Sequence, residues 1–211
     1  MLACPVNPKS INIQCGKCTN CQGVSKLDYP FAEDLRRSNE LVSEIMAFIT
    51  STTGFRCEET KTHKNPDINV LDSNDRLVCR IEAKYLGPEP FKMSRKFVNL
   101  MPKETLVVDH PKLLSYFACK RNDRAFGKDF PIFVVWKFDR ICPDVGGITV
   151  FQEIDVLEEI YNSFGSHRFR ERKAAYNDYQ DGTKLGIPGK YHYSIRECEP
   201  IENLPHWILS L

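Results

Sequence analysis

The sequence lacks any apolar stretch long enough to span a membrane, since its strongest run, Pro131 to Trp136, has only the length of a β-strand. Its first residues also lack the apolar core of a signal peptide, because they include Cys4, Pro5, Asn7 and Lys9. Both absences argue against a membrane or secreted protein. We therefore expect an intracellular, cytoplasmic protein.

The chain also lacks an excess of either charge: 29 Lys and Arg residues against 28 Asp and Glu residues leave a net charge of +1. A nucleic-acid enzyme with this balance needs a local basic patch. Internal repeats and low-complexity tracts are missing too. With 211 residues, of which 42% are hydrophobic and 27% charged, the composition is typical of one folded domain with a small appended module.

The chain also lacks the even number of cysteines that is typical of a disulfide framework, since it has 9. Some are scattered, often in apolar surroundings: Cys57, Cys79, Cys119, Cys142 and Cys198. This distribution favours buried free thiols in a reducing compartment.

The remaining cysteines, Cys4, Cys15, Cys18 and Cys21, gather at the amino terminus, and the middle pair forms a CxxC turn around a glycine. Four thiolates suit tetrahedral Zn²⁺, and a segment with so few apolar residues needs such a metal to fold. The alternatives are an iron–sulfur cluster and no metal at all, as with a disulfide pair. We therefore predict a four-cysteine, zinc-binding segment over residues 1–30 and a larger domain over residues 31–211.

The larger domain is predicted to begin with a helix from Glu33 to about Thr50, because apolar residues recur there at helical spacing and Gly54 ends the segment. Glu40 and Glu44 lie one turn apart on the same stripe of this helix. They are candidates for a functional carboxylate or, equally, for a solvated helix face.

The stretch from His63 to Leu86 predicts a β-hairpin with strands near 67–71 and 76–84, separated by the polar turn Asp72 to Asp75. Residues two apart in a strand share a face, so Glu82 and Lys84 point the same way. Asp67 opens the partner strand, and the hairpin brings it beside Glu82.

Two close carboxylates repel each other, and a divalent cation that prefers oxygen ligands relieves the repulsion. Bound Mg²⁺ can hold a phosphate oxygen and activate a water, while Lys84 orients that water or offsets charge on the phosphate. The alternative is a solvated hairpin in which Glu82 and Lys84 form an ion pair of little energetic weight.

The residues Pro66, Asp67, Glu82 and Lys84 together resemble the motif of the PD-(D/E)xK phosphodiesterase superfamily, which includes many restriction endonucleases and recombination nucleases. The resemblance covers residues 31 to about 140. It implies that Asp67 and Glu82 bind Mg²⁺ or Mn²⁺ and that Lys84 assists the attacking water. A glutamate on the first helix often joins such a site, for which Glu40 is our choice and Glu44 the second.

The resemblance also implies a restriction-endonuclease-like α/β fold, a mixed central β-sheet flanked by helices. The remaining pattern is compatible with it. We expect strands over Thr105–Asp109, Pro131–Phe138 and Tyr191–Cys198, and helices from Pro111 and over Gln152–Phe164.

Two basic segments are candidates for contacts with a nucleic-acid backbone. The first follows the hairpin and contains Lys92, Arg95 and Lys96. Lys64 and His63, just before the proposed site, are further candidates. The second holds Arg168, Arg170, Arg172 and Lys173 around an aromatic residue. The alternative for each is an ordinary charged surface.

These observations predict a metal-dependent DNA endonuclease of the restriction, defence, recombination or transposition type, acting as a homodimer or with a partner protein. One alternative is a non-catalytic nucleic-acid-binding protein on the same fold. The other is a zinc-dependent protein-interaction module joined to an unrelated α/β domain.

Overall fold

The computed structural model describes residues 31–60, 62, 65–89, 91–92, 94–171, 179–180, 183–184 and 189–211. The four predicted zinc ligands, Cys4, Cys15, Cys18 and Cys21, lie outside these residues, as do His63, Lys64, Arg172 and Lys173. Their roles remain predictions. No helix within the described ranges is long and apolar enough to cross a membrane.

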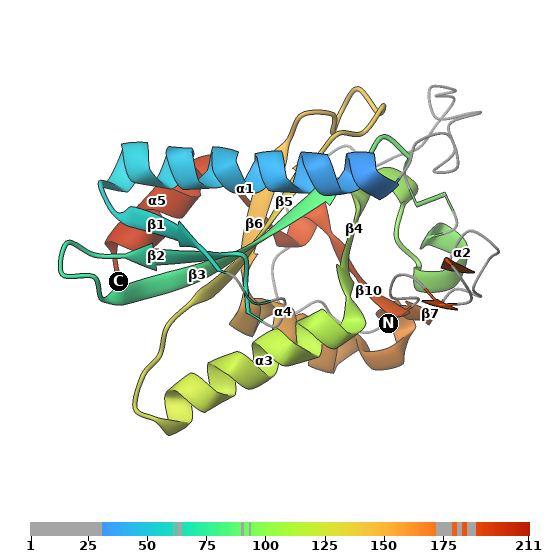
Figure 1. Ribbon diagram of the computed structural model, residues 1–211. Helices are drawn as coiled ribbons and strands as arrows, with labels where there is room; N and C mark the ends of the chain where they lie inside the picture. Colours follow the sequence, from blue (N-terminus) through green and yellow to red (C-terminus); the bar gives the residue numbers. More distant parts are fainter. Residues whose placement is uncertain are drawn as a thin grey trace.

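The fold is a mixed α/β arrangement built on a six-stranded sheet, as expected from the sequence (Figure 1). Its strand order is β1-β2-β3-β5-β6-β11, in which β3 and β5 are parallel and the other neighbours antiparallel. The strands are β1 (Arg56–Glu59), β2 (Ile68–Leu71), β3 (Leu77–Leu86), β5 (Ile132–Phe138), β6 (Thr149–Glu153) and β11 (Glu199–Pro200).

A second, antiparallel sheet has the order β4-β10-β7. Its strands are β4 (Thr105–Asp109), β10 (Gly189–Ser194) and β7 (Phe169–Glu171). Short strands β8 (Tyr179–Gln180) and β9 (Thr183–Lys184) pair with each other. The helices are α1 (Phe31–Thr53), α2 (Ser94–Val98), α3 (His110–Ala125), α4 (Ile154–Phe164) and α5 (Leu204–Leu209).

Helices cover both faces of the large sheet, and Figure 1 shows α1 on one side of β2 and β3 with α3 on the other. The apolar stripe of α1 packs with α5 against alternate residues of the strands, such as Ile81 and Phe133. The second core lies on the opposite face, where Val134 and Trp136 pack with α3, α4 and the small sheet. Because β5 is buried on both faces, its sequence is the nearly unbroken apolar run seen above.

The predicted hairpin is confirmed, with strands β2 and β3 joined by a tight polar turn. The Asp72 backbone N–H donates to the Arg76 carbonyl at 2.9 Å, and the Asp72 carboxylate accepts from the Asn74 backbone N–H at 2.8 Å. Asp75 adopts the left-handed conformation with φ of 59°. These side-chain-to-backbone bonds are the reason why the segment turns there.

Two predicted elements differ in extent from the observed ones. The helix expected from Gln152 begins at Ile154, because Gln152 and Glu153 extend strand β6 beside β5. The strand expected to reach Cys198 ends at Ser194, where the Ser194 hydroxyl accepts from the Arg196 backbone N–H and starts a 3₁₀ turn. In both places a local capping or pairing contact outweighs the periodicity of the sequence.

Candidate active site

Alternation along β3 separates two kinds of side chain. Ile81 and Ala83 belong to the apolar core under α1. Glu82 and Lys84 therefore point to the opposite face, toward α3. Glu82 is 0% exposed, and its Oε1 forms an ion pair with Lys84 Nζ.

Asp67 lies beside this pair because of the hairpin register. Ile68 pairs with Ile81, so the residue before Ile68 stands opposite Glu82. The Asp67 Oδ2 accepts a hydrogen bond from the Ala83 backbone N–H at 2.9 Å. The end of β1 fixes the same position, since the Thr60 backbone N–H donates to the Asp67 carbonyl at 2.8 Å. The hairpin thus brings Asp67, Glu82 and Lys84 together.

Helix α3 supplies two further residues that sequence reasoning missed. Lys112 Nζ lies 3.4 Å from Glu82 Oε1, so two ammonium groups face one carboxylate oxygen. The Tyr116 hydroxyl is buried near the same carboxylate and makes no hydrogen bond of normal geometry. A signal for Lys112 existed: it lies three residues after the predicted strand Thr105–Asp109, at the start of a helix, and polar residues near strand ends often carry function.

The charges in this cluster shift one another's pKa. Burial, followed by the charge of Glu82, raises the pKa of Asp67 from 3.8 to about 6. Burial would also raise the pKa of Glu82, but the ammonium groups of Lys84 and Lys112 outweigh it and lower that pKa. Burial opposes charge on Lys84, yet Glu82 raises the pKa of Lys84 above its ordinary value. Glu82 and Lys84 are thus held in their charged forms, whereas Asp67 gains a proton as the pH falls through about 6.

One oxygen of this cluster lacks a full hydrogen bond: Glu82 Oε2 is buried and makes none of normal geometry, although the Tyr116 hydroxyl lies near the carboxylate. A buried, unpartnered carboxylate oxygen is costly unless another group binds it. Asp67 beside it carries a pKa that is raised first by burial and then by the charge of Glu82. Both observations fit a divalent cation at this position.

Among the described residues, no group of three or more His, Cys, Asp or Glu side chains is placed to hold a metal ion. A pair of carboxylates nevertheless suits Mg²⁺, which proteins usually bind through one or two carboxylates while waters and substrate phosphates supply the other ligands. The residues present therefore fit Mg²⁺ or Mn²⁺ bound together with substrate.

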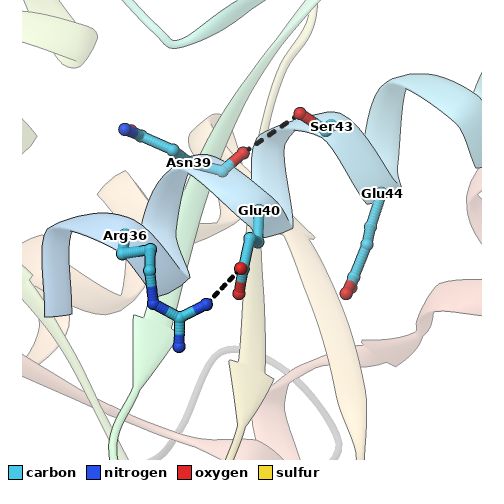
Figure 2. A pocket seen from close by; sticks show the side chains of 5 residues that line it. All are labelled: Arg36, Asn39, Glu40, Ser43 and Glu44. Atoms are coloured by element: carbon cyan, nitrogen blue, oxygen red, sulfur yellow. Dashed lines mark hydrogen bonds and ion pairs between the residues drawn. The ribbon is translucent and has the colours of Figure 1, made fainter. Parts of the chain in front are cut away.

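The structure does not bring Glu40 or Glu44 to this cluster. They line a shallow depression on the exposed side of α1, together with Arg36, Asn39 and Ser43 (Figure 2). Glu40 forms an ion pair with Arg36 one turn away, and Glu44 pairs with Lys137 of β5 at 2.5 Å. Because α1 covers the face of the sheet opposite Glu82, neither glutamate completes the carboxylate pair in this arrangement.

The predicted basic residues divide into two groups. Lys92, Arg95 and Lys96 are exposed near and on α2, and Arg170 is half-buried on β7. Arg168, in contrast, is buried, and it is held by both oxygens of Glu197 at 2.7 and 2.8 Å. Arg168 thus links two segments of the core and does not lie on the surface predicted for it.

Proteins similar to this chain are found among solved structures. No protein-family model matches the chain, and no curated protein matches it. Among solved structures, the Holliday junction resolvase Hjc from Archaeoglobus fulgidus aligns with a TM-score of 0.42 and 10% identity, over 81% of this chain and 96% of that one. A nuclease from a fusselovirus aligns with a TM-score of 0.48 and 9% identity, over 86% of this chain and 94% of that one.

Proposed function

We propose that this protein is a metal-dependent phosphodiesterase that cleaves DNA as an endonuclease. One observation carries the proposal: a fully buried Glu82 has one oxygen bound by two lysines, and its other oxygen, directly beside Asp67, makes no hydrogen bond of normal geometry. A buried carboxylate oxygen left in this way destabilises a fold unless a ligand binds it.

In this proposal Asp67 and Glu82 would hold Mg²⁺ or Mn²⁺. The metal would supply a Lewis acid for the scissile phosphate and a water of lowered pKa. Asp67 directly precedes β2 and Glu82 lies on the adjacent strand β3 of a sheet that is packed on both faces, so the positions of both carboxylates are fixed before substrate arrives.

Lys84 acts as a donor of charge and hydrogen bonds in this site. Because Glu82 raises its pKa, Lys84 carries its proton at neutral pH and cannot accept another from water. Its ammonium group orients the attacking water and offsets the negative charge that develops on the phosphate. Lys112, 31% exposed, stands closer to solvent and is placed to neutralise an entering phosphate.

The test is a cleavage assay on supercoiled plasmid and on single-stranded DNA, with Mg²⁺, Mn²⁺ or EDTA. The variant is Asp67→Asn, which keeps the size and the hydrogen-bond acceptor. The matched control is Asp75→Asn, an exposed carboxylate at the other end of the same hairpin.

We expect metal-dependent cleavage that falls at least 100-fold in Asp67→Asn and stays unchanged in Asp75→Asn. Metal-dependent cleavage that survives Asp67→Asn would contradict the site. Specific DNA binding without cleavage under any metal would instead favour a non-catalytic nucleic-acid-binding protein.

A further inference from the structure

Two segments far apart in the sequence meet on the surface of the protein. Helix α2 lies beside strand β7, as Figure 1 shows, and their side chains touch. The guanidinium of Arg170 lies 4.0 Å from the centre of the Phe97 ring, and Lys96 Nζ lies 5.6 Å from the same centre. Arg170 of the second basic stretch therefore meets Lys96 of the first, and the Phe97 ring lies between them.

Phe97 is 48% exposed, although a phenylalanine ring is the kind of group that folding normally covers. Its neighbours on α2, Arg95 and Lys96, are exposed as well. A ring that is open to solvent and flanked by cations is the arrangement that binds unpaired bases, since the ring stacks on a base while the cations contact its phosphates. Arginine against the ring adds a cation–π contribution.

A row of residues joins this surface to the proposed active site. In the small sheet Lys190 pairs with Asp109 on one side and with Arg170 on the other. Residues directly opposite in antiparallel strands point to the same face, and Lys190 Nζ indeed lies 3.5 Å from Asp109 Oδ1. Asp109 directly precedes α3, whose Lys112 contacts Glu82.

The length of the row sets a distance along a nucleic-acid strand. Two strand spacings separate Asp109 from Arg170, which is about 10 Å. A base-stacked strand rises about 3.4 Å for each nucleotide, so about three stacked nucleotides, or fewer extended ones, follow the part of the row from Asp109 to Arg170. A strand that follows the row thus reaches both the carboxylate pair and Phe97.

We propose that Phe97, Arg170 and Lys96 bind an unpaired nucleotide of the substrate, so that the enzyme prefers DNA in which single-stranded DNA adjoins the cleaved bond. The proposal rests on the proposed function for the position of the cleaved bond. Binding of the unpaired nucleotide itself needs neither metal nor cleavage.

The test measures binding in EDTA, so that no cleavage occurs. Fluorescence anisotropy compares a plain duplex with the same duplex carrying a single-stranded arm. The variants are Phe97→Ala, Phe97→Trp and the control Phe126→Ala, which removes an exposed phenylalanine at the end of α3. A 2-aminopurine in the arm reports stacking through quenching of its fluorescence.

We expect Phe97→Ala to weaken binding of the arm-carrying DNA by about 5- to 150-fold and to leave duplex binding within about twofold. Phe97→Trp restores both affinity and quenching, and Phe126→Ala changes neither. Lys96→Gln weakens binding of both DNAs and reduces the salt dependence of log K by about one.

The proposal is overturned if Phe97→Ala binds the arm as the parent does, if both DNAs lose affinity equally, or if the parent shows no preference for the arm. Its failure is distinct from failure of the proposed function. Metal-dependent cleavage lost in Asp67→Asn, without an effect of Phe97→Ala on binding, would reject only the stacking surface. Arm binding that depends on Phe97, without any cleavage, would reject only the nuclease.

Discussion

The two faces of strand β3 have opposite properties, although their residues alternate along one short segment. On one face Ile81 and Ala83 join a continuous apolar core beneath α1. On the other, Glu82 is buried and Lys84 is half-buried beneath α3, and the two form an ion pair. Apolar burial on the first face stabilises the strand, while the second face carries groups that cost free energy to bury. The comparison teaches that a strand can carry a cluster of poorly solvated charges when the opposite face of the sheet supplies the stability.

The strongest contrast between the faces should be in catalysis. We expect Lys84→Met to lower the rate of metal-dependent cleavage by about 10²- to 10⁴-fold, because it removes the charge that faces the reacting phosphate. Lys137→Met is the matched control, since Lys137 lies on the neighbouring strand and pairs with Glu44 on the α1 face. Single-turnover rates measure the difference. Equal losses in both variants would show that the faces are not functionally distinct.

For the free energy of unfolding we expect the opposite: the α1 face of β3 should matter more than the α3 face. Ile81→Ala deletes a fully buried side chain under α1 and should lower the free energy of unfolding by about 2–5 kcal/mol. Cleavage per folded molecule should change by less than about twofold, because Glu82 and Lys84 point the other way. Urea denaturation and cleavage under native conditions measure the two quantities. A large loss of activity in a still-folded Ile81→Ala would contradict the separation.

The energetic cost of burying Asp67 should appear in the pH dependence of the free energy of unfolding. Its folded pKa of about 6 lies above the ordinary 3.8, so the folded chain binds this proton more tightly than the unfolded chain does. The protonated Asp67 carboxyl therefore contributes its full stabilisation below about pH 4, and this stabilisation is lost as the pH rises through about 6.

Asp67→Asn removes this penalty. In EDTA at pH 8 we expect the variant to be more stable than the parent by about 1–3 kcal/mol, with the difference vanishing toward pH 4. Denaturant unfolding at several pH values measures it. A variant less stable than the parent at pH 8 would mean that the Asp67 carboxylate stabilises the metal-free fold.

The smallest effect is expected on the exposed side of α1. Glu40→Gln removes one partner of an exposed ion pair with Arg36, and such pairs contribute little. Stability should change by less than about 0.5 kcal/mol and cleavage by less than about twofold. A loss of cleavage by tenfold or more would restore Glu40 to the site and contradict its placement on the other face.

Local patterns in the sequence were sufficient for the hairpin. Its turn is made by Asp72, whose side chain bonds the backbone nearby, and the positions of Asp67, Glu82 and Lys84 follow from strand alternation and register. Each of these rules concerns residues close in the sequence or directly paired. The sequence therefore predicted the three central residues of the candidate site.

The positions of residues that are set by packing between distant elements could not be predicted from local patterns. Lys112 and Tyr116 reach Glu82 only because α3 docks on that face of the sheet. The prediction for Glu40 rests on the family resemblance, which points to a glutamate on the first helix, and helical spacing does not reveal which sheet face that helix covers. The sequence predicts Arg168 as a surface cation, because it does not distinguish an arginine in a buried ion pair from one exposed to solvent. The partner of Arg168, Glu197, lies far away in the sequence.

The central claim is that Asp67 and Glu82 form a metal site on the α3 face of β3, and direct titration with Mn²⁺ tests it without any substrate. Calorimetry at pH 8 would compare the parent, Asp67→Asn and the hairpin control Asp75→Asn. We expect the parent and Asp75→Asn to bind Mn²⁺ equally and Asp67→Asn to bind at least about tenfold more weakly, because one of two carboxylate ligands is lost. Equal Mn²⁺ affinity in the parent and in Asp67→Asn would contradict the account.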